Sequence, residues 1–332
     1  MKVLLCTRYD YLKKFGGDSI IIKYLYIYLK KLGVDVTINN GDIYSFNDYD
    51  IIHLFNINAL GEMYKYYKQA CKFKSKIVVS PLYFDMKYYY KYNKEDEKIK
   101  LWNSANLYRE EILKKSDLII CNSNWELNKL KENLKFDTNY KIIYNGAYLL
   151  EDEDVPLYNF VKKYNLNDYV LSVGKINKRK NQLELCKICN ELNYNLVLIG
   201  PVGDIHYLKQ CLSYKNVRYL GIVDNYNLFN AYKFAKVYAL PSYMEITNLS
   251  ALEAAASGCN IVVTEEGASK EYFKDFAIYC NPYNKDSIKE SLIKGYNKKK
   301  NDKLKNFVIE KYSWEDSAKI LYEEYLKLIE FK

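Results

Sequence analysis

The sequence predicts an α/β protein with two doubly wound parallel sheets. Short apolar runs of β type alternate with longer segments of helical period, as in a parallel sheet with helices on both faces. The alternation ends at an acidic linker, 151–156, and then begins again. The 332 residues, 49% of them hydrophobic, are sufficient for two cores. We therefore expect domains over 1–150 and 151–311, followed by a helical segment over 312–332.

The first half contains six candidate strands, each an apolar run bounded by polar residues or glycine. Helical periodicity fills the segments between several of them. The predicted strands are 2–6, 35–39, 50–55, 76–80, 117–122 and 141–145, and the predicted helices include 18–32, 100–115 and 124–135.

The second half repeats the pattern with five candidate strands and ends on an amphipathic segment, 312–330. No strand follows that last helix, so we expect it to pack on a domain already formed, the N-terminal one. Doubly wound sheets bind ligands beyond the carboxyl ends of their strands, and we look for chemistry in the loops there. The predicted strands are 169–174, 195–200, 217–221, 237–241 and 260–264.

Composition argues against a membrane span, a disulfide framework and a metal site. No run approaches the roughly 20 apolar residues of a spanning helix, and Arg8 and Asp10 come too early for a signal peptide, so we expect a cytoplasmic protein. The eight cysteines lie mostly in apolar runs, as reduced core thiols do. Cys186 and Cys189 form a CxxC without a second CxxC or a nearby histidine, which disfavours metal binding.

Positive charge is concentrated in the first half. The net charge is +9, and residues 1–150 hold 24 Lys and Arg against 17 Asp and Glu. The segment 63–92 is both basic and rich in tyrosine. It fits a solvated surface, a site for a membrane surface or an anionic acceptor, or, with less weight, a nucleic-acid site.

The strongest local pattern follows the strand 237–241. The loop SYMEITN leads into the helix LSALEAAASG, which places Glu245 in the loop and Glu253 in the first turns of the helix. Backbone N–H groups at the start of a helix and its positive dipole end can receive a diphosphate. Two carboxylates beside them can bind sugar and ribose hydroxyls, although both residues could also be merely solvated.

The run PSYMEITNLSALEAAASGCNIVVTEEGASKEYF (241–273) resembles the signature PS-x-x-E-G-F-G-L-P-x-L-E-A of glycosyltransferase family 4. Further matches in the expected order are GGDS, SDLIICNS, KIIYNGA, VGKINKRKNQ and the terminal YSWEDSAK, so the resemblance covers nearly the whole chain. The family consists of retaining enzymes of the GT-B fold, in which two Rossmann-like domains face a central cleft. The resemblance implies an acceptor-side N-terminal domain and a donor-side C-terminal domain.

The resemblance also implies roles for single residues. Glu253 matches the carboxylate that binds the nucleotide ribose, and Glu245 matches the one that contacts the transferred sugar. Lys175 and Lys180 match the cations on the donor diphosphate. Two cations there can stabilise charge on the leaving nucleoside diphosphate, the role that a metal plays in other transferases, so no metal or cofactor is expected.

Glycines and backbone groups complete the expected donor site. Gly16 and Gly17 match the glycine loop of the family, where missing side chains let the backbone approach the donor. Backbone N–H groups of Thr247, Asn248 and Leu249 are expected to bind the donor as well.

The chain departs from the family in two loops. ITNLS stands in place of GFGLP, so a glycine and a proline after Glu245 are missing. SPLYFD (80–85) stands where many relatives have a histidine. His53 could lie on the acceptor side or be a buried structural histidine, and Asp85 is a weak substitute; we expect His206 at the surface.

These observations together predict a retaining glycosyltransferase that moves a sugar from a UDP- or GDP-sugar to a hydroxyl of a glycan or glycolipid. We expect no nucleic-acid partner, and a cytoplasmic protein with peripheral membrane association through 63–92. The two departures motivate an alternative, a catalytically silent subunit that binds a nucleotide sugar.

Overall fold

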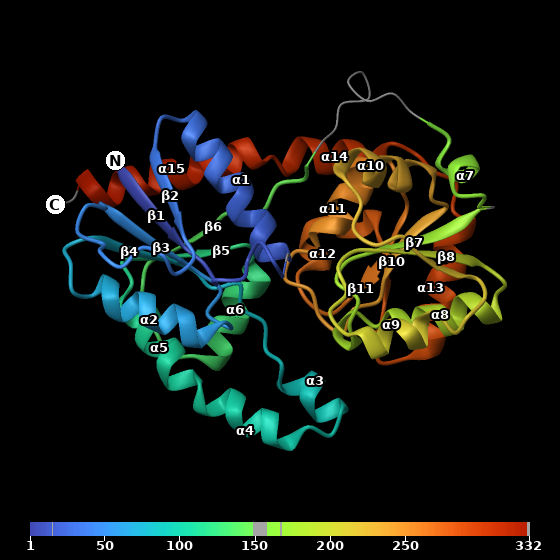
Figure 1. The fold of residues 1–332 in the computed structure, drawn as a ribbon, viewed down its shortest axis with the longest axis horizontal. Coiled ribbons are helices and arrows are strands. Elements are labelled where there is room, and N and C mark those ends of the chain that lie inside the picture. The colour runs from blue at the N-terminus through green and yellow to red at the C-terminus, as the bar shows by residue number, and fades with distance from the viewer. Residues whose placement is uncertain (15, 149–157, 167, 331–332) are drawn as a thin grey trace. The chain divides into compact units, whose positions relative to one another are not determined.

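The computed structural model describes residues 1–14, 16–148, 158–166 and 168–330 (Figure 1). The chain forms two compact units, one of Met1–Asn145 with Trp314–Lys332 and one of Gly146–Ser313. Each unit contains a six-stranded sheet whose neighbouring strands are all parallel. The prediction of two doubly wound α/β sheets is confirmed. The predicted acidic linker, 151–156, lies outside the described residues.

The first sheet has the strand order β2-β1-β3-β4-β5-β6. Its central strands are apolar and wholly buried, which explains why they are visible as apolar runs in the sequence. The chain order reverses between β1 and β3, so a crevice is expected beyond the carboxyl ends of these two strands. The strands are β1 (Lys2–Cys6), β2 (Asp35–Asn39), β3 (Ile51–Phe55), β4 (Lys76–Ser80), β5 (Leu118–Cys121) and β6 (Tyr140–Ile142).

Helices cover both faces of this sheet, with α1 and α15 on one face and α2 and α5 on the other (Figure 1). The single helix expected over 100–115 is wrong, because two helices meet at Ala105. The Ser104 hydroxyl donates to the Leu101 carbonyl oxygen at 2.9 Å, a local bond that competes with a regular helix. The helices are α1 (Gly17–Lys31), α2 (Leu60–Ala70), α3 (Lys87–Tyr92), α4 (Asp96–Ser104), α5 (Asn106–Lys115) and α6 (Asn124–Asn133).

The last helix, α15 (Trp314–Glu330), belongs to the first unit. Trp314 stacks on Tyr24 of α1 with ring centroids 5.1 Å apart. The Ser317 hydroxyl donates to the Tyr144 carbonyl oxygen at 2.6 Å. The apolar stripe of α15 is thus buried against segments about 170 to 290 residues earlier in the chain.

The second sheet has the strand order β12-β11-β10-β7-β8-β9, and its chain order reverses between β7 and β10. The sequence predicted five of these strands and missed β12, which is only three residues long and lies at the edge. The strands are β7 (Tyr169–Val173), β8 (Asn195–Ile199), β9 (Val217–Tyr219), β10 (Val237–Leu240), β11 (Ile261–Thr264) and β12 (Ile278–Cys280).

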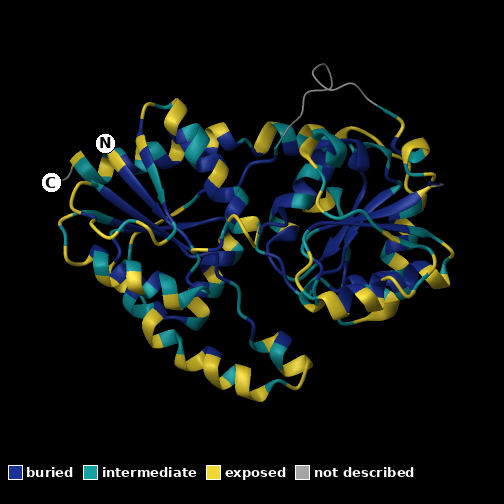
Figure 2. Ribbon diagram, viewed as in Figure 1, coloured by how far each residue is buried: buried dark blue, intermediate teal, exposed yellow. Residues whose placement is uncertain are grey.

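Helices also cover both faces of the second sheet. Leu185 of α8, Leu208 of α9 and Leu292 of α13 share one buried cluster with the strands, and Figure 2 shows both sheets as buried layers. The other face carries α10 and α11 (Figure 1). The helical elements are α7 (Phe160–Lys163), η1 (Lys178–Lys180), α8 (Gln182–Glu191), α9 (Ile205–Cys211), α10 (Asn225–Phe234), α11 (Leu249–Ala256), α12 (Ser269–Phe273), η2 (Lys274–Phe276), α13 (Lys285–Asn297) and α14 (Lys303–Lys311).

Candidate functional site

The candidate site of the second unit lies where its chain order reverses. The loop after β7 carries Lys175 and ends in the 3-10 turn η1 with Lys180. The loop after β10 carries Glu245 and leads into α11. Because β7 and β10 are parallel neighbours, their carboxyl ends lie side by side and the two loops meet.

Lys180 and Glu245 form a buried ion pair at this point. The Lys180 ammonium donates to Glu245 Oε1, and the side chains expose only 13% and 8% of their surface. Burial acts to raise the pKa of Glu245, but the charges of Lys180 and Arg179 outweigh it and hold the pKa below its ordinary value. Burial lowers the pKa of Lys180, and Glu245 offsets only part of that effect. Each charge is therefore stabilised mainly by the opposite charge of its partner, because little of either side chain is exposed to water.

The backbone of Glu245 is held from one side by the segment after β11. Its N–H donates to the Glu266 carbonyl oxygen at 3.3 Å, and its carbonyl oxygen accepts from the Ala268 N–H at 3.2 Å. Gly267, with φ of +109°, lies between these bonds. A Cβ atom on Gly267 would lie 1.8 Å from the Glu245 carbonyl oxygen, so this close approach requires glycine.

Arg179 holds the same loop from the other side. Its guanidinium donates to the Met244 carbonyl oxygen at 2.7 Å, and its own carbonyl oxygen accepts from the Tyr243 N–H at 2.9 Å. Arg179 therefore fixes the backbone immediately before Glu245. The sequence did not single out this residue, although it lies in the KINKRK turn beside Lys180.

The helix α11 begins next to this loop. Asn248 is its N-cap residue and has φ of +58°, a left-handed conformation that asparagine tolerates better than most residues. Its side chain does not cap the helix, and its Nδ2 atom is buried without a hydrogen-bond partner among the described residues. Thr247, Asn248 and Leu249 are all buried, at the end of the helix where N–H groups lack intrahelical partners.

Glu253 lies one turn into α11 and is half-buried. Its Oε2 accepts a hydrogen bond of 3.1 Å from the hydroxyl of Tyr232, a residue of α10. Burial raises the pKa of Glu253 to about 7, and the Tyr232 bond opposes that rise. Near neutral pH this carboxyl group is therefore divided between its charged and neutral forms.

Lys175 remains outside the ion pair. It is half-buried and forms no ion pair with a described residue. Its side chain runs along Gly203, where an added Cβ would lie 2.9 Å from Lys175 Cε. The ammonium charge of Lys175 is thus not neutralised by a carboxylate in the described part of the chain.

In the first unit, Gly16 and Gly17 begin α1. Gly16 is in an extended conformation that any residue can adopt, but a Cβ there would lie 3.1 Å from Asp18 Oδ1. Asp18 pairs with Arg8 at 2.7 Å, and Arg8 also pairs with Asp10 at 2.6 Å. Glycine at position 16 thus makes room for the Arg8 ion pairs, and Gly17 is exposed.

His53 and Asp85 do not share one environment. His53 is fully buried, with Nδ1 2.5 Å from the Tyr325 hydroxyl and Nε2 2.8 Å from the Ser80 hydroxyl, and burial lowers its pKa to about 3. Both ring nitrogens are engaged inside the unit, which favours the structural alternative over the acceptor-side one. Asp85 is partly exposed and pairs with Lys87 at 3.2 Å.

Glu126 was missed by the sequence analysis. It is fully buried in the first turn of α6, and its carboxylate accepts from the backbone N–H groups of Tyr83 and Asn122, each at 2.7 Å. Burial raises its pKa to about 7. Glu126 thereby ties the loop after β4, which contains Asp85, to the loop after β5. The pattern Ser123-x-x-Glu126 is a capping-box signal, and Glu126 N–H does donate to the Ser123 hydroxyl at 3.0 Å.

Among the described residues, no group of three or more histidine, cysteine, aspartate or glutamate side chains is arranged to hold a metal ion. No helix in that part of the chain has both the length and the apolar character needed to cross a membrane.

Comparison with known proteins gives a consistent result. Residues 159–314 match the family model of glycosyl transferases group 1. The chain is 32% identical over 203 residues to an uncharacterized glycosyltransferase of Methanocaldococcus jannaschii. That match covers 54% of this chain and 52% of the relative, so the chain spans about half the length of that protein.

Solved structures match over the whole length. Sucrose-phosphate synthase from Thermosynechococcus elongatus superposes with a TM-score of 0.80 at 16% identity, covering 100% of both chains. Anabaena HepE in complex with UDP and glucose superposes with a TM-score of 0.73 at 13% identity, covering 98% of this chain and 99% of HepE. At these identities the likeness concerns the fold, and it confirms the GT-B class predicted from the sequence.

The contact between Gly267 and Glu245 gives a test of the site's backbone. We expect Gly267→Ala to lower the free energy of unfolding more than Gly221→Ala, measured by denaturant titration. Both glycines have positive φ, but nothing lies within 4 Å of a Cβ at Gly221, so that variant reports only the conformational cost, about 1–2 kcal/mol. Equal losses in the two variants would contradict a rigid contact at Glu245.

Proposed function

We propose that the chain is a retaining glycosyltransferase using a UDP- or GDP-sugar, and the match of residues 159–314 to the family model of glycosyl transferases group 1 supports this proposal. The acceptor in this proposal is a hydroxyl of a glycan or glycolipid. The observation that carries the proposal is the buried Lys180–Glu245 ion pair at the chain reversal of the second sheet, beside the start of α11.

Each group has a task in the proposed reaction. Lys175 and Lys180 stabilise the negative charge that develops on the departing nucleoside diphosphate, as preorganised cations do in a site that excludes water. The N–H groups at the start of α11 add hydrogen bonds to the same anion, as does Asn248 Nδ2, which has no partner among the described residues. Glu253 binds the ribose and Glu245 the transferred sugar.

Retention fits this arrangement of charges. In the proposed mechanism the bond between the anomeric carbon and the diphosphate oxygen breaks as the acceptor oxygen approaches from the same face. The departing phosphate oxygen takes the acceptor proton. A histidine base is not required for this route, which accommodates both SPLYFD at 80–85 and the burial of His53.

Activity is tested by nucleoside diphosphate release from a panel of UDP-, GDP-, ADP- and CMP-sugars. With the donor that is turned over, we expect Glu245→Gln and Lys180→Gln each to slow release at least about 100-fold, because each removes a group that acts on developing charge. Lys178→Gln is the matched control, since Lys178 is an exposed member of the same turn. A donor that stabilises the fold without any release would contradict catalysis and favour the silent binding subunit.

The raised pKa of Glu253 predicts a pH dependence of donor binding. The ionised carboxylate accepts hydrogen bonds from both ribose hydroxyls, so we expect affinity for the donor to rise roughly tenfold from about pH 6 to pH 8, through a pKa of about 7. The Tyr232 bond lowers this pKa, and Tyr232→Phe should move the midpoint upward. Glu253→Gln should bind weakly at every pH; an unchanged profile in that variant would assign the titration to another group.

The linked effect on stability has the opposite sign. The folded protein holds the Glu253 proton more tightly than the unfolded chain, whose pKa is near 4.5. The contribution to the free energy of unfolding is therefore largest below about pH 4.5 and is lost as the pH rises to about 7.

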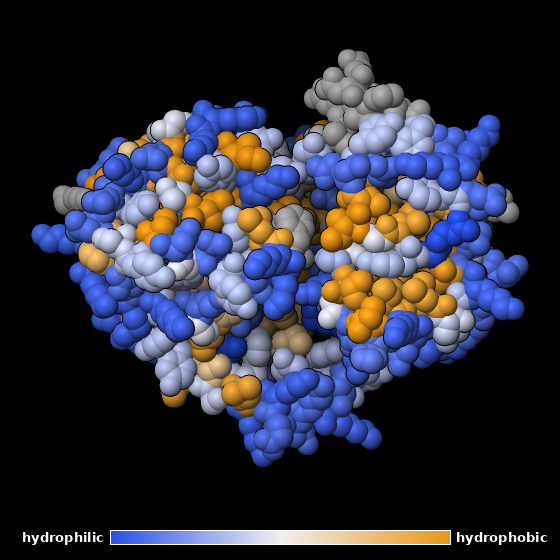
Figure 3. Space-filling view, in the orientation of Figure 1, coloured by the Kyte–Doolittle hydropathy of each residue, from blue (hydrophilic) through white to orange (hydrophobic). Residues whose placement is uncertain are grey.

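We also propose peripheral binding of the segment 63–92 to an anionic membrane. Lys72, Lys74 and Lys91 are exposed there, as are Tyr88 and Tyr92. The region of α3, which ends this segment, and of α4, which follows it, is coloured mainly as hydrophilic in Figure 3, which suits an electrostatic contact better than insertion.

Vesicle co-sedimentation tests this membrane contact. We expect the intact chain to bind anionic phosphatidylglycerol vesicles at low salt, not zwitterionic ones, and to be released by about 0.5 M salt. Lys72→Glu with Lys74→Glu should weaken binding several-fold. Lys209→Glu with Lys215→Glu changes the net charge equally at exposed positions outside the segment and should have less effect. A chain that ignores anionic vesicles while remaining active on a soluble acceptor would refute the contact.

A further inference from the structure

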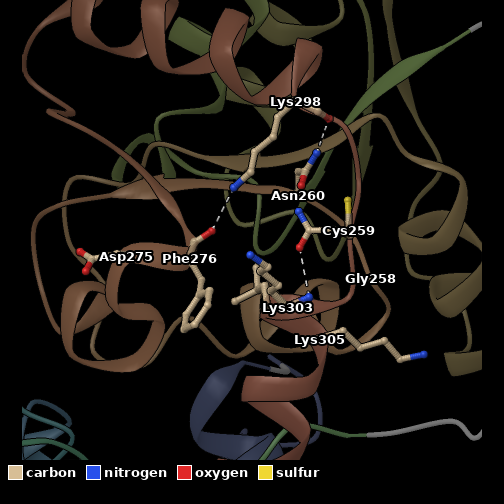
Figure 4. Close-up of a pocket in the computed structure, with 10 residues that line it drawn as sticks. Gly258, Cys259, Asn260, Asp275, Phe276, Lys298, Lys303 and Lys305 are labelled. Carbon is tan, nitrogen blue, oxygen red and sulfur yellow. Dashed lines mark hydrogen bonds between the residues drawn. The ribbon is translucent and has the colours of Figure 1, made fainter.

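The second unit contains a pocket at the opposite end of α11 from Asn248. Its volume is about 250 Å³ (Figure 4). The walls come from the C-terminal end of α11, the loop that precedes β11, η2, and the segment between α13 and α14. The pocket thus lies at the amino end of β11, whereas the candidate site lies at the carboxyl ends of β7 and β10. It is separate from the donor site.

The lining of this pocket is strongly basic. The segment 298–305 holds five lysines and a single acidic residue, Asp302. Lys298, Lys299, Lys300 and Lys303 form no ion pair with a carboxylate in the described part of the chain. Figure 4 shows the Lys303 side chain over the pocket and the Asp275 carboxylate, also in the lining, directed away from it.

Further lysines lie near the pocket without lining it. Lys300 donates to the Lys233 carbonyl oxygen at 2.8 Å. Burial lowers the pKa of Lys300, and the charges of Lys233 and Lys236 lower it further, while Cys259 opposes them. These positive charges repel one another, and a bound anion would relieve that repulsion. A concave surface strengthens their electrostatic potential.

Fixed groups give the pocket a defined shape. The buried Asn260 side chain donates to the Lys298 carbonyl oxygen at 2.7 Å, and the Lys298 ammonium donates to the Phe276 carbonyl oxygen at 3.4 Å (Figure 4). These bonds hold the wall that carries Lys298 against the strand layer. The volume of about 250 Å³ is large enough to admit a phosphate group together with part of a small molecule.

We propose that this pocket binds the phosphate group of a small metabolite, with Lys298 and Lys303 as its direct cationic contacts. Two ammonium groups and the amide of Asn301, all in the lining, suit a phosphate dianion. The inference does not depend on the proposed transfer reaction, since the pocket shares no residue with the donor site.

The test uses thermal shift on the intact chain with three probes: inorganic phosphate, glucose 6-phosphate, and potassium chloride at matched ionic strength. We expect both phosphates to raise the melting temperature and chloride to leave it unchanged. Tighter binding of glucose 6-phosphate identifies a phosphate ester as the ligand class, whereas equal or tighter binding of inorganic phosphate identifies the free anion. An equal effect of chloride would overturn the proposal.

Variants locate the binding. Lys298→Gln with Lys303→Gln should weaken phosphate binding at least tenfold and leave nucleotide-sugar binding unchanged. Lys209→Gln with Lys215→Gln, at two exposed positions of the same unit, is the matched control and should bind phosphate like the parent chain. If Lys180→Gln abolishes the phosphate effect while the pocket variant retains it, the anion occupies the donor site and the proposal is wrong.

Discussion

Parallel pairing of every strand in each sheet is the constraint on which the rest of the structure depends. Consecutive parallel strands must be joined by crossovers, so all their carboxyl ends lie at one edge of the sheet. Where the chain order reverses, two loops distant in sequence become neighbours. Lys180 and Glu245, 65 residues apart, meet for this reason. The ion pair is a consequence of topology first and of local sequence second.

The apolar strands could be predicted because burial on both faces leaves continuous runs of Val, Ile and Leu in the sequence. The edge strand β12 could not, since three residues give too little pattern. The break at Ala105 falls inside a segment of continuous helical period, which gives no signal of it. These differences concern short elements and helix ends, where local contacts decide.

Part of the candidate site could also be predicted from the sequence, and part of it could not. Glu245, Glu253, Lys175 and Lys180 could be singled out from motif spacing, because each follows a strand at the binding edge. The partners of buried groups could not be foreseen. His53 bonds to Tyr325, 272 residues away, and Glu126 binds backbone groups of another loop. Such contacts are set by how helices pack, which a single sequence does not specify.

The loop ITNLS lacks the glycine and the proline of the signature that it resembles, and contacts from neighbouring segments hold the backbone that leads into it. The segment before Glu245 is fixed by Arg179, and the carbonyl side of Glu245 is fixed by the close approach of Gly267. Asn248 then enters the left-handed region, which glycine would occupy without strain. Asn248 therefore adopts a conformation that favours glycine although it carries a side chain. The amide of that side chain lies buried beside the start of α11.

In the proposed reaction, the binding of a diphosphate depends on which of the cations near the start of α11 are already paired. Lys180 is already neutralised by Glu245, and Arg179 is engaged by the backbone, so the first unneutralised cation is Lys175. For Lys180 to reach the diphosphate, its bond to Glu245 must be replaced. If a sugar hydroxyl donates a hydrogen bond to Glu245 at the same time, the buried carboxylate is not left without a partner. In the proposed reaction, diphosphate binding and sugar binding would therefore be coupled through the Lys180–Glu245 ion pair. A nucleoside diphosphate without its sugar would provide only one of the two partners that must replace this ion pair.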